Sequence, residues 1–368
     1  MKYLIIIIFI LFFISCDTTE KNSNVCSGFE CPTNQICAIT NDNEAICIDD
    51  GSDKCENIDC NKNSYCKDGV CLCDEGYQLE NNNCILESSD NKFKLRVLAS
   101  NLTSGNYQTY EEEGINILKA LKADIILVQE FNYDGEISNF VKTTFGDEFT
   151  YFRGTPTGNG DIPNGVISRY PIIDKGEWKD ERVSDRLIDW VIIETPTKKI
   201  FAVSVHLKAK ENKYQIKAAE LISKKIYNHR VAHPNEYFYI VGGDFNGAAS
   251  LCRDNSCNGF KKYNNENIFY TALPDPYSEY NRGTTTNATK TRQLDFILVD
   301  YSLKDFQIST DYCKTEDDCK SYPSGLVFRS DEYSQSDLDR YFSPVQTNDS
   351  EVMQMQHMGV VKDFLIAY

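Results

Sequence analysis

Ten of the fifteen cysteines in this 368-residue chain lie between residues 26 and 84, which divides the sequence into two parts of different character. Cysteines at this density in a short segment indicate a disulfide framework in an oxidising, extracytoplasmic compartment. Zinc is the alternative role for clustered cysteines, but residues 17–90 contain no histidine, which favours disulfides. The rest of the chain must supply the large hydrophobic core.

The formal net charge of −17 is concentrated in the cysteine-rich part. Residues 17–90 carry 16 acidic and 4 basic side chains (−12), residues 91–368 carry 39 and 33 (−6), and Lys2 adds the remaining +1. With 41% hydrophobic and 25% charged residues, the chain is not collagen-like, fully disordered or a polytopic membrane protein. A generally basic surface for nucleic acid is excluded, whereas an enzyme that reaches a phosphodiester through a metal ion and a few local cations is not.

The N-terminus has the pattern of a signal peptide at residues 1–15. Lys2 precedes an apolar run, Tyr3–Ile14, which is shorter than the about 20 residues that span a bilayer. The ending Phe-Ile-Ser-Cys resembles a bacterial lipobox, which implies a lipid on Cys16 and leaves an even fourteen cysteines; the alternative is ordinary cleavage with Cys16 as a free thiol. We expect a polar tether at residues 16–25 and a cell-envelope lipoprotein or secreted protein, anchored to the membrane by the lipid.

Six cysteines are spaced C-x4-C-x5-C-x4-C-x-C-x10-C, at Cys55, Cys60, Cys66, Cys71, Cys73 and Cys84. This spacing resembles an epidermal-growth-factor-like (EGF-like) module at residues 51–88, and residues 26–50 resemble a truncated copy. Spacing alone permits fifteen pairings of six cysteines. The resemblance implies the bridges Cys55–Cys66, Cys60–Cys71 and Cys73–Cys84, with Cys26–Cys37 and Cys31–Cys47 in the copy. We interpret these modules as a stalk; an adhesive or ligand-binding role is the alternative, and the acids before Cys55 match the family's calcium pattern only loosely.

From Phe93 onward the pattern becomes that of an α/β protein. Phe93–Ala99 alternates as a strand, Glu111–Ala123 has helical apolar spacing, and Asp124–Gln129 is a buried strand. Lys210–Tyr227 carries an amphipathic helical pattern. Further strands are predicted at Gly165–Ser168, Leu187–Glu194, Ile200–Val205, Tyr237–Gly242, Leu294–Val299 and Val360–Ile366.

Polar residues flank these apolar runs in a regular way. Asn101, Glu130, His206, Asp244 and Asn246 follow strands, and the carboxyl ends of strands are where open α/β sheets place their ligands. Asp295 and His357 precede strands instead. If those two strands run antiparallel to the others, all seven residues reach one mouth of a mixed sheet.

The residue types suit metal-assisted phosphoester hydrolysis. Glu130 and the Asn101 amide offer the hard oxygen ligands that Mg2+ or Mn2+ prefers. One histidine can remove a proton from water while a carboxylate orients its other nitrogen, and a second can stabilise charge on a phosphoryl oxygen. A two-histidine zinc site is the competing hypothesis, but this part of the chain has no H-x3-H or C-x2-C pair. Each residue alone is compatible with a turn or a surface position, so the prediction rests on the set.

Seven fragments in order resemble the endonuclease/exonuclease/phosphatase superfamily across residues 92–368: Ala-Ser-Asn101-Leu, Val-Gln-Glu130-Phe, Asn164-Gly-Val-Ile-Ser-Arg169-Tyr-Pro, Ser-Val-His206-Leu, Gly-Gly-Asp244-Phe-Asn246, Gln-Leu-Asp295-Phe-Ile and His357-Met-Gly-Val-Val. The resemblance implies an α/β fold, a four-layer sandwich of two mixed β-sheets with helices outside, preceded by the small disulfide-rich modules. It also implies a Mg2+-dependent phosphodiesterase.

The roles implied by the resemblance are as follows. Glu130 and Asn101 hold the metal, Asp244 and Asn246 orient the attacking water and the phosphate, and His206 binds the phosphate or protonates the leaving oxygen. His357, oriented by Asp295, is the general base or its partner. One departure is Gln356, because the family usually has aspartate before this histidine. Metal affinity could fall, or Asp349 or Glu351 could compensate.

Several residues are less specific. Asn164 and Arg169 are assigned to substrate binding, with a turn and a strand-end cation as the respective alternatives. His229 and His233 near the end of a helix are expected to be structural. Cys252–Cys257 and Cys313–Cys319 are expected to be local disulfides. The polar segment Asp311–Ser350 is interpreted as an insertion that shapes the substrate mouth or makes a surface excursion.

The substrate is the least determined feature. A histidine at position 206 resembles the secreted deoxyribonuclease and sphingomyelinase branches, and Arg282, Lys290 and Arg292 could contact DNA or form a solvated loop face. We therefore predict a surface-tethered or secreted DNA endonuclease. The alternatives are a sphingomyelin or phospholipid phosphodiesterase, and a non-catalytic adhesion or binding lipoprotein. The sequence identifies no protein partner.

Overall fold

The computed structural model describes residues 92–102, 112–133, 135–157, 162–180, 186–209, 212–246, 275–280, 282–353 and 355–367, and short strands at 35–39, 45–49, 64–67, 70–73, 77–80, 83–86 and 269–270. The chain divides into two compact units, residues 1–89 and 90–368. The signal peptide, Cys16, the tether and the Cys252–Cys257 pair lie outside the described residues, so those predictions stay untested. No helix in the described part of the chain is long and apolar enough to cross a membrane.

The first unit contains three antiparallel hairpins. Their strands are β1 (Gln35–Ile39) with β2 (Ala45–Asp49), β3 (Ser64–Lys67) with β4 (Val70–Cys73), and β5 (Tyr77–Glu80) with β6 (Asn83–Leu86). The hairpins place cysteines opposite each other, Cys37 against Cys47 and Cys66 against Cys71. Cys47 is disulfide-bonded. The cysteine pairings and the EGF-like character of these modules stay predictions.

The first sheet of the second unit has the order β17-β21-β7-β8-β10-β9, with β20 also pairing with β21. Only β7 and β8 run parallel; the other neighbours are antiparallel, so the sheet is mixed. Its strands are β7 (Lys92–Asn101), β8 (Ile125–Gln129), β9 (Thr150–Arg153), β10 (Gly165–Ser168), β17 (Gln307–Ile308), β20 (Leu326–Val327) and β21 (Val360–Ala367).

The second sheet has the order β11-β12-β13-β14-β16-β15. It is also mixed, because β13 and β14 run parallel while the other neighbours are antiparallel. Its strands are β11 (Ile172–Trp178), β12 (Ile188–Ile193), β13 (Lys199–His206), β14 (Tyr237–Asp244), β15 (Phe269–Tyr270) and β16 (Asp295–Asp300).

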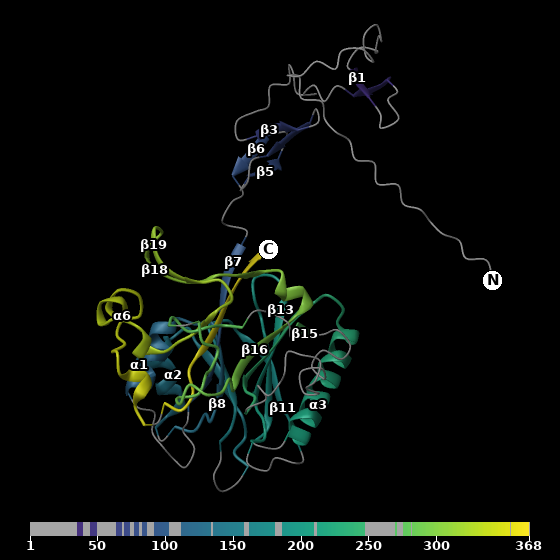
Figure 1. Cartoon of the computed structure of the whole chain (residues 1–368). Coiled ribbons are helices and arrows are strands. Elements are labelled where there is room, and N and C mark those ends of the chain that lie inside the picture. The colour runs from purple at the N-terminus through teal and green to yellow at the C-terminus, as the bar shows by residue number, and fades with distance from the viewer. Residues whose placement is uncertain are drawn as a thin grey trace, which may run out of the picture. The chain divides into compact units, whose positions relative to one another are not determined.

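Three hydrophobic clusters separate four layers, which confirms the predicted sandwich. The central cluster joins the two sheets, for example Leu127 of β8 and Ile240 of β14. A second cluster packs α1 (Glu112–Leu121) and α2 (Ile137–Phe145) on the outer face of the first sheet. A third packs α3 (Asn212–Ala232) on the outer face of the second, so the helices flank the sheets on opposite sides (Figure 1). The predicted strands are all present, and α3 is longer than the sequence predicts.

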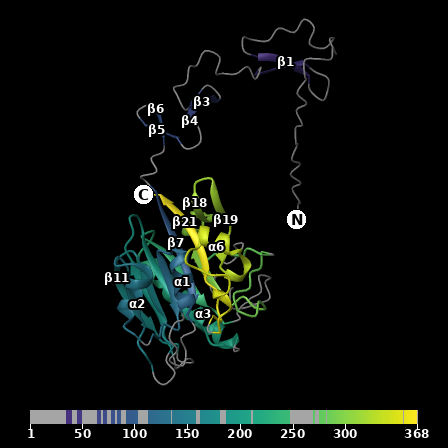
Figure 2. The same ribbon diagram turned by 90° about the vertical axis from the view of Figure 1, so that its left-hand side faces the viewer.

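The segment Asp311–Ser350 is not a polar surface excursion, and that alternative is wrong. It forms β18 (Thr310–Thr315), β19 (Asp318–Tyr322), η4 (Ser330–Glu332), α6 (Gln335–Tyr341) and η5 (Asp349–Glu351), beside β21 (Figure 2). Buried aromatics from this segment join the α1 cluster: Tyr312, Tyr322, Phe328, Tyr333 and Phe342. Few but large aromatic side chains, rather than a regular apolar repeat, hold it in the core. The predicted Cys313–Cys319 disulfide is present in the β18–β19 hairpin.

Candidate active site

The strand directions bring the predicted site residues to one edge of the sandwich. β13 runs parallel to β14, which sets His206 opposite Asp244, and β16 runs antiparallel to β14, which sets Asp295 opposite Asp244. β7 runs parallel to β8, with Asn101 opposite Gln129, the residue before Glu130. β21 begins beside the carboxyl-terminal part of β7, so its preceding segment brings His357 to the same edge. Strand ends and strand starts therefore meet as the sequence predicts.

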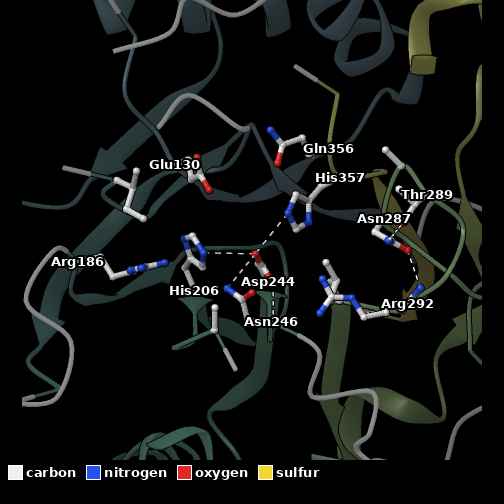
Figure 3. A pocket seen from close by; sticks show the side chains of 14 residues that line it. Glu130, Arg186, His206, Asp244, Asn246, Asn287, Thr289, Arg292, Gln356 and His357 are labelled. Atoms are coloured by element: carbon white, nitrogen blue, oxygen red, sulfur yellow. Dashed lines mark hydrogen bonds and ion pairs between the residues drawn. The ribbon is translucent and has the colours of Figure 1, made fainter. Parts of the chain in front are cut away.

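A pocket of about 550 Å³ opens at this edge (Figure 3). Five predicted residues line it: Glu130, His206, Asp244, Asn246 and His357. Its other lining residues are Ile162, Arg186, Ala209, Asn287, Ala288, Thr289, Arg292, Leu294 and Gln356. Asn101 and Asp295 are buried behind the pocket wall and contact lining residues. The predicted convergence on one pocket is confirmed, whereas the chemical role of each residue stays a prediction.

Asp244 is the centre of the site. Its Oδ2 accepts hydrogen bonds from Asn101 Nδ2 at 3.1 Å and Asn246 Nδ2 at 3.4 Å, and lies 3.3 Å from His206 Nε2 and 3.6 Å from His357 Nε2. Its Oδ1 accepts a hydrogen bond from the Asn246 backbone amide at 2.7 Å. Burial raises the pKa of Asp244, while His357 and these donors oppose the rise. The Nε2 atoms of both histidines therefore face the same carboxylate oxygen, Asp244 Oδ2.

His357 and Asp295 form a buried pair. His357 Nδ1 lies 3.0 Å from Asp295 Oδ2 and 3.2 Å from Oδ1, and its Nε2 faces Asp244. Burial alone would lower the pKa of His357, but the carboxylates of Asp295, Asp244 and Glu130 outweigh it and raise the pKa to about 10. In the absence of a metal cation, the ring is therefore an imidazolium at neutral pH.

His206 has the opposite electrostatics. Burial, with the positive charges of Arg186 and His357, lowers its pKa well below the ordinary value, so the ring is neutral at neutral pH. A neutral imidazole has one N–H. If Nε2 donates it to Asp244, Nδ1 is left as a buried acceptor that makes no hydrogen bond with the described residues. The site therefore holds one charged and one neutral histidine on either side of Asp244.

The residues present fit a divalent cation. Carboxylate oxygens are the ligands that Mg2+ and Mn2+ prefer, and Glu130 presents one in the pocket wall. Asn101 Nδ2 donates to Glu130 Oε1 at 3.2 Å as well as to Asp244, so one amide fixes the spacing of two carboxylates. Among the described residues, Asp244, Asp295 and His357 also bring one ligand atom each to within 4.8 Å of one another. Because His357 itself lies between Asp295 and Asp244, a cation in the pocket would take its oxygen ligands from Glu130 and Asp244.

The backbone is strained at two site residues. Glu130 has a φ of 54° and Asn246 a φ of 58°, in the left-handed region that costs a non-glycine residue about 1 kcal/mol or more. Asn246 is supported by hydrogen bonds from its side chain to the Leu207 carbonyl and to Asp244, and by Gln215 of α3, which donates to its carbonyl. These contacts hold the Asn246 side chain beside Asp244 in spite of the backbone strain.

Two residues that were assigned to substrate binding do not line the pocket. Arg169 follows β10 at the end away from Gly165, and its guanidinium pairs with Asp124 at 2.9 Å and lies over the Phe149 ring. The strand-end alternative is therefore the correct one for Arg169. Asn164 is fully buried, and its side chain donates to the Leu187 carbonyl at 2.6 Å. Asn164 supports the pocket wall from the inside.

The departure at position 356 is real and uncompensated among the described residues. Gln356 lines the pocket where the resemblance implies aspartate. Asp349 is buried in η5 and its carboxylate accepts the Gln346 amide at 2.9 Å, while Glu351 is exposed in the same turn. Neither lines the pocket, so the idea that they compensate is wrong.

The structure adds residues that the sequence analysis missed. Arg186 lines the pocket beside His206, and Thr286 donates a hydrogen bond to Asp295 at 2.7 Å. Arg186 directly precedes the predicted strand that begins at Leu187, and the rule that found Asp295, a polar residue before an antiparallel strand, also applies to it. Thr286 lies in a loop among other threonines and has no such signal.

A family model described as "Endonuclease/Exonuclease/phosphatase family" matches residues 115–331, more than half of the chain. The chain belongs to this family. The matched range contains Glu130, His206, Asp244 and Asp295, whereas His357 lies beyond it. The family is one of hydrolytic phosphoesterases, which agrees with the class of reaction that the sequence predicts.

Solved structures with a similar arrangement share little sequence with this family member. An endonuclease/exonuclease/phosphatase family protein from Leptotrichia buccalis is 16% identical, with a TM-score of 0.45, 73% of this chain and 98% of that chain covered. Beta toxin from Staphylococcus aureus is 14% identical (TM-score 0.43; 74% and 100% covered). Truncated TDP2 from Caenorhabditis elegans is 12% identical (TM-score 0.43; 76% and 100% covered).

Among curated proteins, mouse (Mus musculus) zonadhesin is 32% identical over 95 aligned positions, and the match covers 20% of this chain. The chain spans about 2% of the length of that protein.

Proposed function

We propose that this protein is a metal-dependent phosphodiesterase that cleaves DNA. The observation that carries the proposal is the convergence of Glu130, His206, Asp244 and His357 on one pocket, with Asp295 bonded to His357. An oxygen-rich cation site beside two histidines of different charge is what hydrolysis of a phosphoester needs. Adhesion alone gives no reason for this arrangement.

The metal would be held by Glu130 and Asp244, which Asn101 keeps together. A bound Mg2+ or Mn2+ would polarise the phosphoryl oxygen and, by neutralising part of the carboxylate charge, lower the pKa of His357. In its neutral form, His357 would accept a proton from the attacking water at Nε2, while Asp295 holds the proton on Nδ1. Asn246 and Asp244 orient the water, and Arg186, which lies beside His206, contacts the phosphate.

Arginines support a polyanionic substrate. Arg186 lies beside His206, and Arg292 lies on the other side of Asp244 (Figure 3). A polynucleotide carries phosphates on both sides of the bond that is cleaved, so a cation on each side matches it. The head group of sphingomyelin carries one phosphate and a cationic choline, which matches this pair of arginines less well. The sequence offers Arg282, Lys290 and Arg292 as contacts for DNA. Of these three, Arg292 lines the pocket.

The proposal is tested by offering the purified protein plasmid DNA and, separately, sphingomyelin vesicles, each with Mg2+, with Mn2+ and with chelator. We expect nicked and linear plasmid only in the metal-containing reactions. Release of choline phosphate with intact plasmid would move the protein to the lipid phosphodiesterases. If the protein turned over neither substrate, the proposed function would fail and the alternative of a non-catalytic binding protein would be favoured.

We also propose that the protein acts outside the cytoplasm, tethered by a lipid on Cys16. Cysteine density and the lipobox-like ending support this proposal. Mass spectrometry of the mature N-terminus tests it, because a diacylglyceryl group on Cys16 adds a defined mass. An unmodified N-terminus downstream of Cys16 would instead indicate a secreted protein.

A further inference from the structure

Thr286 is a fully buried threonine between β16 and the segment that carries His357. We propose that Thr286 is a positioning residue that fixes the Asp295–His357 pair for the reaction. This inference rests on the proposed function, since it concerns how the same pocket moves a proton. Three sets of contacts support it.

The hydroxyl group of Thr286 has only one way to direct its proton. The backbone amides of Leu294 and Asp295 both donate to Thr286 Oγ1, at 2.8 Å and 3.0 Å. A hydroxyl oxygen has two lone pairs and one proton, and these amides occupy the lone pairs. The proton therefore goes to Asp295 Oδ2, which lies 2.7 Å from Oγ1. The backbone amides at the start of β16 therefore direct the Thr286 hydroxyl proton towards Asp295.

The consequence is a fixed orientation of Asp295. Its Oδ2 accepts from Thr286 and lies 3.0 Å from His357 Nδ1, so the carboxylate cannot rotate without losing one of these contacts. Asp295 therefore presents an acceptor to Nδ1 of His357, which keeps the proton on that nitrogen and leaves Nε2 facing Asp244. Thr286 thereby acts on the reacting nitrogen through Asp295.

The backbone of Thr286 holds the histidine segment as well. Its carbonyl accepts a hydrogen bond from the amide of Met358 at 2.7 Å, and the next residue, Asn287, bridges His357. Its amide donates to the Arg292 carbonyl at 2.9 Å. Thr286 is thus hydrogen-bonded to Asp295, to Met358, which follows His357, and to Arg292 of the pocket, which is more than closing a turn requires.

The first test compares Thr286→Val with Thr286→Ser. Valine keeps the shape of threonine and removes the hydroxyl, whereas serine keeps the hydroxyl. We expect Thr286→Val to lower kcat on DNA by about 10-fold to 100-fold, the usual cost of losing such a supporting contact, with KM nearly unchanged. Thr286→Ser should restore most of kcat. The neighbouring Thr285→Val is the matched control and should behave as wild type. An unchanged kcat in Thr286→Val, or no rescue by serine, overturns the proposal.

The second test separates positioning from simple stabilisation. Valine also leaves the amides of Leu294 and Asp295 without their acceptor, so thermal stability will fall whichever role is correct. In an Asp295→Asn background, a positioning residue has nothing left to position, so Thr286→Val should change kcat by less than about 2-fold. A loss in melting temperature should remain in both backgrounds, because the amides of Leu294 and Asp295 lose their acceptor in each. If Thr286→Val lowered kcat by the same factor in the Asp295→Asn background as in the wild type, its role would be structural and the proposal would be refuted.

A third measurement does not depend on turnover. With ¹⁵N-labelled histidine, the His357 ring gives an Nδ1–H resonance when Asp295 is held in place. We expect this resonance in the wild type and in Thr286→Ser, and its loss or broadening in Thr286→Val; an identical resonance in Thr286→Val refutes the proposal. If the wild type cleaves neither DNA nor sphingomyelin, the proposed function fails, and the NMR result still decides the role of Thr286.

Discussion

Asp244 shows how one side chain sets the properties of its neighbours. Four nitrogen atoms lie within 3.6 Å of its Oδ2, those of Asn101, His206, Asn246 and His357. Its negative charge helps to raise the pKa of His357, and the positive charge on His357 in turn contributes to the low pKa of His206. The two histidines differ in charge because Asp295 and Asp244 raise the pKa of His357, whereas burial, with the charges of Arg186 and His357, lowers that of His206.

Replacement of His357 tests the proton transfer directly. We expect His357→Ala to lower kcat on DNA by at least about 100-fold, the low end of the contribution of a general base. His233→Ala is the control, because that ring lies at the end of α3, 3.7 Å from Glu236, and outside the pocket. Steady-state kinetics on a fluorescent oligonucleotide measures both. Equal activity of His357→Ala and wild type would remove His357 from the mechanism.

A buried carboxylate outside the site predicts a pH-dependent stability. Asp189 on β12 is fully buried; burial and the nearby Glu177 raise its pKa well above the ordinary value, against the influence of Arg153. The folded state therefore binds a proton that the unfolded chain releases at a pH of about 4. Stability is fully present below that pH and is lost as the pH rises toward the folded-state pKa.

We accordingly expect Asp189→Asn to be more stable than the wild type at pH 8, with a difference that shrinks toward pH 4. An amide is neutral at every pH, so it removes the cost of keeping this carboxyl protonated. Urea denaturation between pH 4 and pH 8 measures the difference, and Asp174→Asn, at an exposed position on β11, is the control. A pH-independent difference would show that Asp189 does not titrate in this range.

At the residue scale, the sequence predicts a side chain well when its position follows from the end of a strand. Asn101, Glu130, His206 and Asp244 are of this kind, and all reach the site. Arg169 shows the limit, because it also ends a strand, but β10 is antiparallel to β8 and places it away from the pocket. Loop residues such as Thr286 depend on contacts that no local pattern encodes.

At the scale of elements, the close approach of the two sheets near the site depends on a glycine in β14. Gly243 of β14 has a φ of 133°, and a Cβ there would lie 2.3 Å from the Val205 carbonyl oxygen and 2.5 Å from Gln129 Nε2. β13, β14 and β8 can come this close only without a side chain. Gln129 then donates to Ser204 Oγ at 2.9 Å and links the two sheets just below the pocket.

We expect Gly243→Ala to lower the free energy of unfolding by about 1–3 kcal/mol from backbone strain alone. It should also lower kcat, because the displaced residue precedes Asp244. Gly283→Ala is the matched control, since a Cβ there would meet only Ser278 Oγ at an ordinary 3.4 Å. Urea denaturation and oligonucleotide cleavage measure the two effects. A fully stable and active Gly243→Ala would contradict the close approach of these strands.

Elements with a strong period could be predicted, and those held by long-range packing could not. The continuous apolar runs of β8, β13 and β14 identify them as buried strands, which is why their ends identify the site. β11 lies at the edge of its sheet, is exposed or half-buried along its whole length, and has no clear period. The β18–β19 hairpin and α6 owe their place to single aromatics such as Tyr322 and Phe342, which contact the α1 cluster from far along the chain.

At the scale of the whole molecule, charge and chemistry are in different units. Residues 17–89 carry 15 acidic and 4 basic side chains (−11), whereas residues 90–368 carry 40 and 33 (−7). The pocket lies entirely in the second unit, residues 90–368. A strongly acidic segment repels DNA, but repulsion between exposed charges is screened over about 8 Å at physiological ionic strength. Charge in the first unit therefore affects encounter with DNA more than the reaction itself.

The last prediction concerns the separation of these units. We expect a chain of residues 90–368 to fold on its own and to keep kcat within about 2-fold of that of residues 17–368, because both sheets and all pocket residues belong to it. Its KM for DNA should be lower at low salt and similar at high salt, because only the exposed acidic charge has been removed. Cleavage kinetics of both chains across ionic strength measure this. A large loss of kcat in the shorter chain would mean that the cysteine-rich unit takes part in the reaction, and the stalk interpretation would then be wrong.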